Sequence, residues 1–149
     1  MQPDERLAAR LLVACSELTR AATAAAAATP LSLTQGRVLG NLERRGPLRV
    51  SRLAALERCA QPSMTALVTR CADAGLVLRG ADPDDARAVL VHLTARGAQA
   101  LAEHRRALAE PLREALALLG DDGRTGAEDA AALLDRLAGA VRGTTAPTA

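Results

Sequence analysis

The residues whose type and spacing could do chemistry lie between positions 60 and 97, in the run AQPSMTALVTRCADAGLVLRGADPDDARAVLVHLTARG. At ~100° per residue, one side of a helix beginning near residue 61 would carry Pro62, Ala66, Thr69 and Asp73, with Ser63, Thr65 and Arg70 on its flanks. Such small side chains let a helix approach a nucleic-acid groove closely, and an arginine beside them can reach a phosphate. The two histidines are far apart, and no nucleophile–base pair or glycine-rich phosphate loop indicates catalysis.

The opposite side of the same helix is apolar and predicts a core contact. It carries Met64, Leu67, Val68, Cys71 and Gly75. Gly75 permits the left-handed turn that ends a helix. We expect a strand at 76–80 that breaks at its glycine, a loop at 81–86, a paired strand at 88–93 and a helix capped by Thr94.

The loop carries three aspartates and is followed by an arginine. Asp82, Asp84 and Asp85 would repel phosphate, so a role at a DNA-binding tip needs an explanation. We expect Asp85 to hold Arg87 by a charge-assisted hydrogen bond, so that the guanidinium enters the groove in one conformation. A cation site is the alternative, but the loop lacks the glycine pattern and the distal glutamate of a calcium loop. No metal site and no cofactor are therefore expected.

Along its whole length the sequence predicts six helices and one β-hairpin. The helices are expected at residues 4–28, 32–45, 53–56, 61–75, 94–119 and 125–141. Ser32 with Gln35 forms a capping box at the start of the second helix, Thr125 with Glu128 forms another at the start of the last, and the glycines at 120–123 break the chain between helices. The fold class is mainly α with a small β-hairpin, a winged helix-turn-helix module flanked by long terminal helices.

This order of elements divides the chain into four parts. Residues 1–30 form an N-terminal dimerisation helix, 31–97 the winged helix-turn-helix module, 98–142 the C-terminal dimerisation helices, and 143–149 a disordered tail. The apolar stripes of the terminal helices exceed what so small a module can cover. We therefore expect the same helices of a second subunit to cover them in a homodimer.

Composition and charge narrow the class of protein. Half of the 149 residues are apolar (49%), which suffices for a core, although Phe, Trp, Tyr and Lys are absent. Residues 31–97 hold ten arginines against six acids, so the middle of the chain is its basic part. No run reaches the ~20 apolar residues of a membrane span and no signal-like core precedes residue 30, so we expect a cytoplasmic protein.

These segments together resemble the MarR-type (multiple antibiotic resistance) winged-helix regulators. The resemblance covers roughly residues 31–101 and rests on LSLTQGRVLGNLERRGPLRVSRLA, PSMTALVTRCADAGLV and DPDDARAVLVHLTARG, with the D-x-R element at Asp85 and Arg87. It implies that the helix beginning near Ser63 enters the major groove of double-stranded DNA and that the wing arginine enters the minor groove. It also implies a homodimer that acts as a repressor on a pseudo-palindromic, inverted-repeat operator and is released by a small-molecule effector.

The sequence departs from the family pattern in the recognition helix. The position before it, usually a capping serine, is Ala60, and the usual outward arginine and aspartate are Ala66 and Thr69. These two small residues could contact thymine methyl groups or could only permit close approach of the helix. Arg70 flanks this face and is expected to contact phosphate.

The sequence offers two ways in which the protein could sense a signal, an effector-binding site or a reactive thiol. The family's effectors commonly pack against aromatic side chains, which this chain lacks, so aliphatic contacts with Arg37 or His104 would have to bind an effector. His104 is otherwise expected to be solvated on an exposed helix. The alternative is a thiol-based redox sensor using Cys15, which lies on the first helix as in the hydroperoxide-sensing members, but without their tyrosines.

Two further alternatives remain at the level of sequence. The three cysteines, Cys15, Cys59 and Cys71, form no CxxC pair, and buried structural thiols are the default interpretation. A winged helix whose recognition helix lacks the usual outward arginine and aspartate could also serve as a protein-interaction module with weak DNA binding. Salt-dependent binding to a palindromic DNA distinguishes the two.

Overall fold

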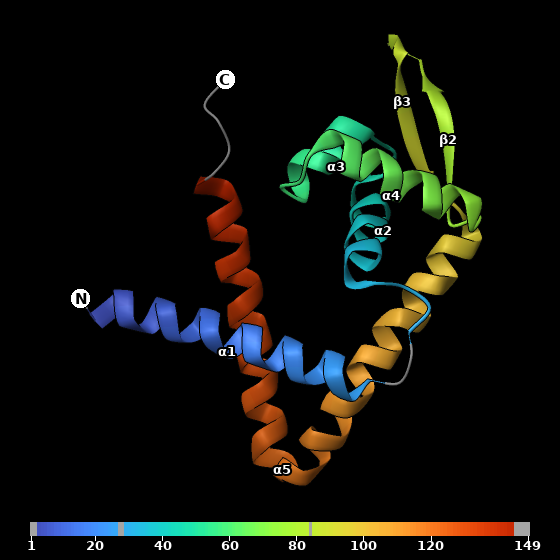
Figure 1. Ribbon diagram of the computed structural model, residues 1–149. Helices are drawn as coiled ribbons and strands as arrows, with labels where there is room; N and C mark the ends of the chain where they lie inside the picture. Colours follow the sequence, from blue (N-terminus) through green and yellow to red (C-terminus); the bar gives the residue numbers. More distant parts are fainter. Residues whose placement is uncertain (1–2, 27–28, 84, 145–149) are drawn as a thin grey trace. The chain divides into compact units, whose positions relative to one another are not determined.

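The computed structural model describes residues 3–26, 29–83 and 85–144, and the chain divides into two compact units between Ala109 and Glu110. The elements are α1 (Pro3–Ala25), α2 (Leu33–Arg45), β1 (Leu48–Arg49), α3 (Val50–Leu56), α4 (Gln61–Asp73), β2 (Val77–Asp82), β3 (Asp85–Leu93) and α5 (Ala95–Thr144) (Figure 1). A mainly helical fold with a small antiparallel sheet is confirmed. No helix in the described ranges combines the length and the apolar character that crossing a membrane requires.

The sheet is larger than the predicted hairpin. Its strand order is β1-β3-β2, with β1 pairing antiparallel to β3 through Leu48 opposite Val91. The expected break at Gly80 is wrong, because β2 continues to Asp82, which pairs with Asp85 at the start of β3. Of the predicted loop 81–86, residues 81–82 belong to β2, 85–86 belong to β3 and Pro83 lies in a turn, while Asp84 lies outside the described residues. Glycine is tolerated here because its backbone still completes the ladder opposite Leu90.

A buried core joins α2, α3, α4, the sheet and the start of α5. Its largest fully buried side chains are Leu39, Leu42, Leu53, Met64, Leu101, Val38, Val68, Val77, Val91 and Cys71. Alanine contributes less than the composition suggests, since Ala54 is the only alanine within the buried part of this cluster as described. The core rests on branched aliphatic side chains, which bury the most apolar area per residue in the absence of aromatic rings.

Of the three helix starts for which a capping residue was predicted, those at Ser32 and Thr94 are confirmed. The Ser32 hydroxyl accepts from the backbone N–H of Gln35 at 3.2 Å, and the Gln35 side chain accepts from the backbone N–H of Ser32 at 2.9 Å. Thr94 accepts from the backbone N–H of Gly97 at 2.9 Å and donates to the carbonyl of Gly75 at 2.7 Å. This hydroxyl thus ties the first turn of α5 to the end of α4.

The third start is wrong. Thr125 does not cap a helix, because its hydroxyl donates to the carbonyl of Asp121 at 3.2 Å, one helical turn earlier. The break is confined to Gly120 (φ 68°, ψ −163°), and helical geometry resumes at the next residue. A single positive-φ glycine is enough to change the direction of a helix. The helix then continues to Thr144, so residues 143 and 144 do not belong to a disordered tail, and 145–149 lie outside the described residues.

Helix α1 ends at Ala25, short of the expected residue 28, and 27–28 lie outside the described residues. Four large aliphatic side chains of α1 are exposed: Leu7, Leu12, Val13 and Leu18. In the second unit the exposed large aliphatic side chains are Leu118, Leu119, Leu133, Leu134, Leu137 and Val141. Both segments therefore carry apolar surface that this chain leaves open to solvent.

Candidate nucleic-acid interface

The predicted outward face of α4 is confirmed as exposed surface. Its exposed members are Pro62, Ser63, Thr65, Ala66, Thr69, Arg70 and Asp73, while Met64, Leu67, Val68 and Cys71 are buried. The helix begins after Ala60, which makes no side-chain capping bond. The Thr65 and Thr69 hydroxyls donate to the carbonyls of Gln61 (2.9 Å) and Thr65 (3.0 Å) within the helix. Both hydroxyls thus present acceptor oxygens rather than donors to an approaching ligand.

The wing formed by β2 and β3 lies beside this helix. Arg79 on β2 directs Nη1 toward the Thr69 hydroxyl at 3.5 Å, the long limit of a hydrogen bond. In Figure 1 the two strands project beyond α4 on the side of the module that also carries α3. A recognition helix and a wing side by side form the surface of a winged-helix DNA reader.

Arg49 and Asp82 form an ion pair that sequence reasoning missed. Arg49 Nε donates to Asp82 Oδ2 at 2.6 Å, and the Asp82 side chain is only 5% exposed whereas that of Arg49 is 44% exposed. The interpretation of Asp82 as a phosphate-repelling loop residue is therefore wrong, because its carboxylate is buried against a guanidinium. No local signal in the sequence indicated this pair, because Arg49 reaches the wing through β1, a two-residue strand that pairs with β3.

The expected Asp85–Arg87 pair is not tested. Asp85 is exposed at the start of β3, and its Oδ2 lies 3.9 Å from Arg49 Nη1. Arg87 belongs to β3 rather than to the loop, and its side chain lies outside the described residues. Among the described residues, Arg49 thus places a positive charge beside Asp85.

A concavity opens between the helix-turn-helix and the wing. It has a volume of about 340 Å³ and is lined by Arg49, Val50, Ser51, Gln61, Thr65, Arg79, Asp85, Ala88 and Val89. These residues come from the end of β1, the start of α3, the start of α4 and both wing strands. Two arginines, two hydroxyls and an amide share this small depression with one carboxylate, that of Asp85. The surplus of guanidinium groups suits an oxyanion better than an apolar ligand.

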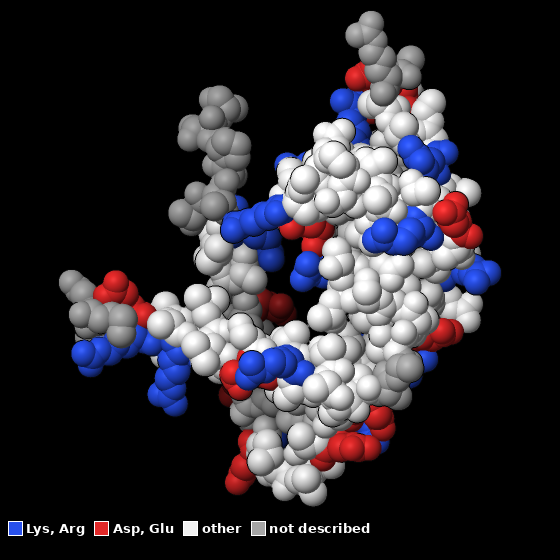
Figure 2. All heavy atoms as spheres, viewed as in Figure 1, with Lys and Arg blue, Asp and Glu red and all other residues white. Residues whose placement is uncertain are grey.

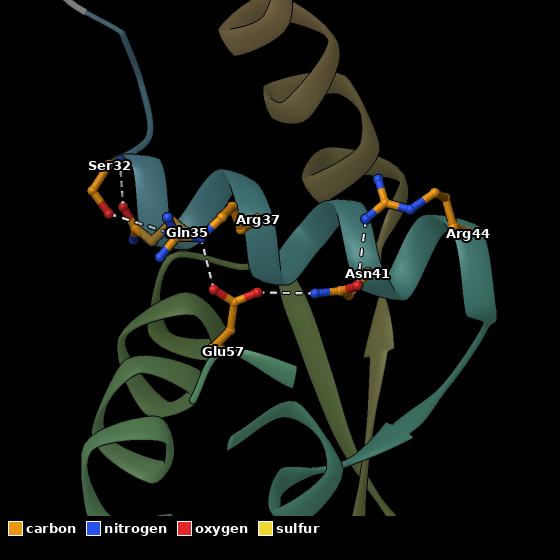
Figure 3. A network of polar contacts seen from close by, with 6 residues as sticks. All are labelled: Ser32, Gln35, Arg37, Asn41, Arg44 and Glu57. Carbon is orange, nitrogen blue, oxygen red and sulfur yellow. Dashed lines mark hydrogen bonds and ion pairs between the residues drawn. The ribbon is translucent and has the colours of Figure 1, made fainter. Parts of the chain in front are cut away.

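A polar network holds α2 against the end of α3 (Figure 3). The Glu57 side chain is 7% exposed and accepts from Arg37 Nε at 2.7 Å and from Asn41 Nδ2 at 3.0 Å. Arg44 Nη2 donates in turn to Asn41 Oδ1 at 3.3 Å. Glu57 precedes Arg58, a non-glycine residue with positive φ (50°), so the network anchors the turn that leads into α4.

The interpretation of His104 as a solvated side chain is wrong. His104 is 4% exposed on α5, and its Nδ1 has no hydrogen-bond partner among the described residues. A methyl group added at Gly36 of α2 would lie 2.6 Å from His104 Nε2, so the imidazole packs directly on that glycine. Burial lowers the pKa of His104 below its ordinary value, with a smaller contribution from the charge of Arg105.

The three cysteines differ, contrary to the default of buried structural thiols. Cys71 is buried and its pKa is raised by desolvation, whereas Cys59 is exposed and Cys15 is half-buried. Cys15 lines a groove of about 640 Å³ along α1, together with Leu12, Ser16, Thr19, Arg20, Thr23, Ala24 and Leu33. The part of the chain that the structure describes holds no group of three or more potential metal ligands.

Arginines are spread over the winged module. On the face shown in Figure 2, blue side chains are separated by uncharged surface and accompanied by a few acids. On this face the arginines thus form separate points of positive charge and no continuous patch. Separate guanidinium groups can match separate backbone phosphates.

Known proteins share this arrangement. Residues 31–89 match the model of the MarR family. The chain is 37% identical over 134 residues to an HTH-type transcriptional regulator of Mycobacterium tuberculosis, covering 90% of this chain and 94% of that one. A crystal structure of a transcriptional regulator protein from Pseudomonas aeruginosa is 34% identical, with a TM-score of 0.75 and coverage of 93% and 98%. The PcaV regulator of Streptomyces coelicolor, solved in complex with its natural ligand, shares the fold at 24% identity and a TM-score of 0.55, with 94% of each chain covered.

Proposed function

This chain belongs to the MarR family of helix-turn-helix transcriptional regulators, and from that premise we propose that it acts as a homodimeric repressor on an inverted-repeat operator. The observation that carries the proposal is the exposed small-residue face of α4 beside the wing. A helix without bulky outward side chains can sit deep in a major groove, where base edges are read. As a chromosome-binding regulator it acts in the cytoplasm.

In this proposal the residues of the interface have different roles. Ser63, Thr65, Ala66 and Thr69 face base edges, with Pro62 at the first turn of the helix. Arg70, exposed at the side of α4, contacts a phosphate and sets the register of the helix. On the wing, Arg87 enters the minor groove and Asp85 restrains it. Because direct donors to bases are few, sequence preference rests largely on shape and methyl contacts.

The apolar surfaces of the terminal helices support the homodimer. Leu7, Leu12 and Leu18 on α1 and the leucines of residues 118–137 are exposed in the single chain. Surfaces of this kind on a folded monomer indicate an interface. We propose that residues 1–30 and 98–142 pair with the same segments of a second copy, which places two α4 helices on successive major grooves.

An effector would release the DNA. The PcaV structure contains a natural ligand, and this chain offers the groove of about 640 Å³ along α1. Of the two side chains proposed from sequence, Arg37 would have to exchange its bond to Glu57 for the effector. His104 instead has a buried nitrogen without a partner among the described residues, which supports a hydrogen bond to an incoming ligand.

Selection of bound DNA from a random pool tests the proposal. The expected result is recovery of an inverted repeat whose affinity falls steeply with salt. The control is a variant with Arg70→Ala and Thr69→Ala, which should retain its fold and lose enrichment. Failure to recover any sequence, with affinity unaffected by salt, would instead favour the protein-interaction module.

The redox alternative is favoured by one observation, the access of Cys15 to the α1 groove. It predicts that organic hydroperoxide releases DNA from the wild type but not from Cys15→Ser. The absence of tyrosine leads us to expect no release in either protein. Cys71→Ser serves as the control for oxidation of a buried thiol.

A further inference from the structure

We propose that the Arg49–Asp82 ion pair positions the wing against the helix-turn-helix, and that the exposed edge of Arg49 contacts a DNA backbone phosphate in the adjacent concavity. The inference rests on the proposed DNA binding and deepens it by naming a contact outside the recognition helix. The pair joins the end of β1 to the end of β2, 33 positions apart in the sequence.

Arg49 stands where the sheet meets the helix-turn-helix. It is the last residue of β1, opposite Leu90 of β3, and it immediately precedes the first turn of α3. Since the strand order is β1-β3-β2, its side chain spans the central strand to reach Asp82 on the far strand. The pair therefore links both outer strands of the sheet to the helix that supports α4.

The burial of the two partners is unequal. The Asp82 side chain is 5% exposed and its Oδ2 lies 2.6 Å from Arg49 Nε, whereas the Arg49 side chain is 44% exposed. A buried carboxylate needs such charge-assisted hydrogen bonds. Nε is used by Asp82, and a guanidinium has five N–H donors in one plane. Nη1 lies 3.9 Å from Asp85, beyond good hydrogen-bond length, so the outer edge retains donors for a ligand. The buried carboxylate thus fixes the direction in which that edge points.

The concavity supplies the rest of the contact. Arg49 and Arg79 both line its 340 Å³, Ser51 and Gln61 add a hydroxyl and an amide, and the Asp85 carboxylate lies on the same wall. The two guanidinium groups outnumber the single acid, so the lining favours an anion. It lies between the start of α4 and the wing, the two elements that would follow opposite grooves of the duplex. The strand between those grooves would present its phosphates at this position. We therefore assign the occupant as a phosphate of the DNA backbone.

Fluorescence anisotropy with a labelled operator over a series of salt concentrations tests the assignment. Each phosphate contact contributes about 0.9 to the magnitude of the slope of log K against log salt, which corresponds to roughly eightfold in DNA affinity at 0.1 M salt. Arg49→Ala should therefore bind the operator roughly eightfold more weakly at 0.1 M salt, with a slope smaller by about 0.9. The charge-matched control is Arg106→Ala, an exposed arginine of α5 outside the concavity, which should leave the slope unchanged.

Two further variants separate positioning from charge. Arg49→Lys keeps the charge but not the planar fork, so affinity should fall severalfold with an unchanged salt slope. Asp82→Asn removes a negative charge and should still weaken binding, because the wing and Arg49 lose their restraint. Circular dichroism melting of each variant identifies those that fail to fold, and Arg49→Lys, the milder change, then decides the positioning role.

The outcomes are distinguishable. A wild type without salt-dependent DNA binding would overturn the proposed function itself. A wild type that binds, with a salt slope unaltered in Arg49→Ala or tighter binding by Asp82→Asn, would overturn only the inference drawn from this ion pair. At matched ionic strength, inorganic phosphate should displace DNA from the wild type more than from Arg49→Ala, and equal displacement from the two proteins would overturn the assignment to this concavity.

Discussion

The contact between Gly36 and His104 predicts both the direction and the size of a change in the free energy of unfolding. Replacing Gly36 by alanine places a methyl group 2.6 Å from Nε2 and 2.8 Å from Cδ2 of an imidazole that is 4% exposed. The ring is buried and packs on Gly36 of α2, so the methyl group would meet it at once. Gly40, one turn further along α2, is the matched control: its methyl group would meet the ends of the flexible Arg44 and Arg105 side chains at 3.3 and 3.5 Å.

Two opposing effects set the magnitude. Glycine to alanine inside a helix stabilises the protein by up to about 1 kcal/mol, because alanine restricts the unfolded chain. Inserting a methyl group into a packed site costs about 1–3 kcal/mol. Gly40→Ala should therefore raise the free energy of unfolding by roughly 0.5–1 kcal/mol. Gly36→Ala should lower it by up to about 2 kcal/mol.

Urea denaturation followed by circular dichroism measures both values. The protein concentration must be equal in all samples, because dissociation of a dimer would contribute to unfolding. In the double variant Gly36→Ala with His104→Ala the clash is absent, so the two substitutions should show a favourable coupling of about 1–3 kcal/mol. Equal stability of Gly36→Ala and Gly40→Ala, or a coupling near zero, would refute the close packing of His104 on Gly36.

The remaining predictions concern pH, the wing, assembly and oxidation. Burial lowers the folded-state pKa of His104, so the unfolded chain binds the proton more readily. Stability should therefore fall as pH drops through the ordinary histidine range near ~6.5. In thermal melts recorded over a series of pH values, His104→Gln should show a weaker dependence of melting temperature on pH in that range. Arg87→Ala should weaken operator binding by ~1–3 kcal/mol with the melting temperature unchanged, and Asp85→Ala should weaken it less; tighter binding by Asp85→Ala in an anisotropy titration would show that this carboxylate only repels DNA. Deleting residues 124–149 should convert a dimer into unstable or aggregated chain, and sedimentation of the full chain as a stable monomer at micromolar concentration would contradict the dimer. Cys15→Ser should leave DNA binding as insensitive to hydroperoxide as the wild type, with only a slight loss of thermal stability.

Local signals in the sequence were sufficient for the helix faces and for most helix starts. The alternation of buried and exposed positions along α4 follows from helical periodicity, and the capping box at Ser32 and the cap at Thr94 depend on residues within one turn. The same reasoning failed at Thr125, where a capping-box pattern lies inside a helix. Gly120 alone had already redirected the chain, so no new helix start was needed there.

Contacts between distant segments were beyond this reasoning. Strand β1 has two residues, too few to show any alternation, and it exists because β3 offers an edge for Leu48 and Arg49. The pair of Arg49 with Asp82 joins residues 33 positions apart. The bond from Arg37 to Glu57 spans 20 positions and gives an apparent ligand-binding arginine a structural partner.

By itself the sequence determined the winged-helix order, the small exposed face of α4 and the absence of catalytic groupings, since each of these depends on residue type and local spacing. Tertiary structure alone decided which charges are buried and what they touch. His104 belongs to a helix that looks solvated, yet Gly36 allows α2 to approach closely enough to cover it. Asp82 belongs to an acidic loop by sequence, yet the three-stranded sheet brings a guanidinium over it. Burial and ion pairing depend on the approach of elements separated along the chain, and no local pattern encodes that distance.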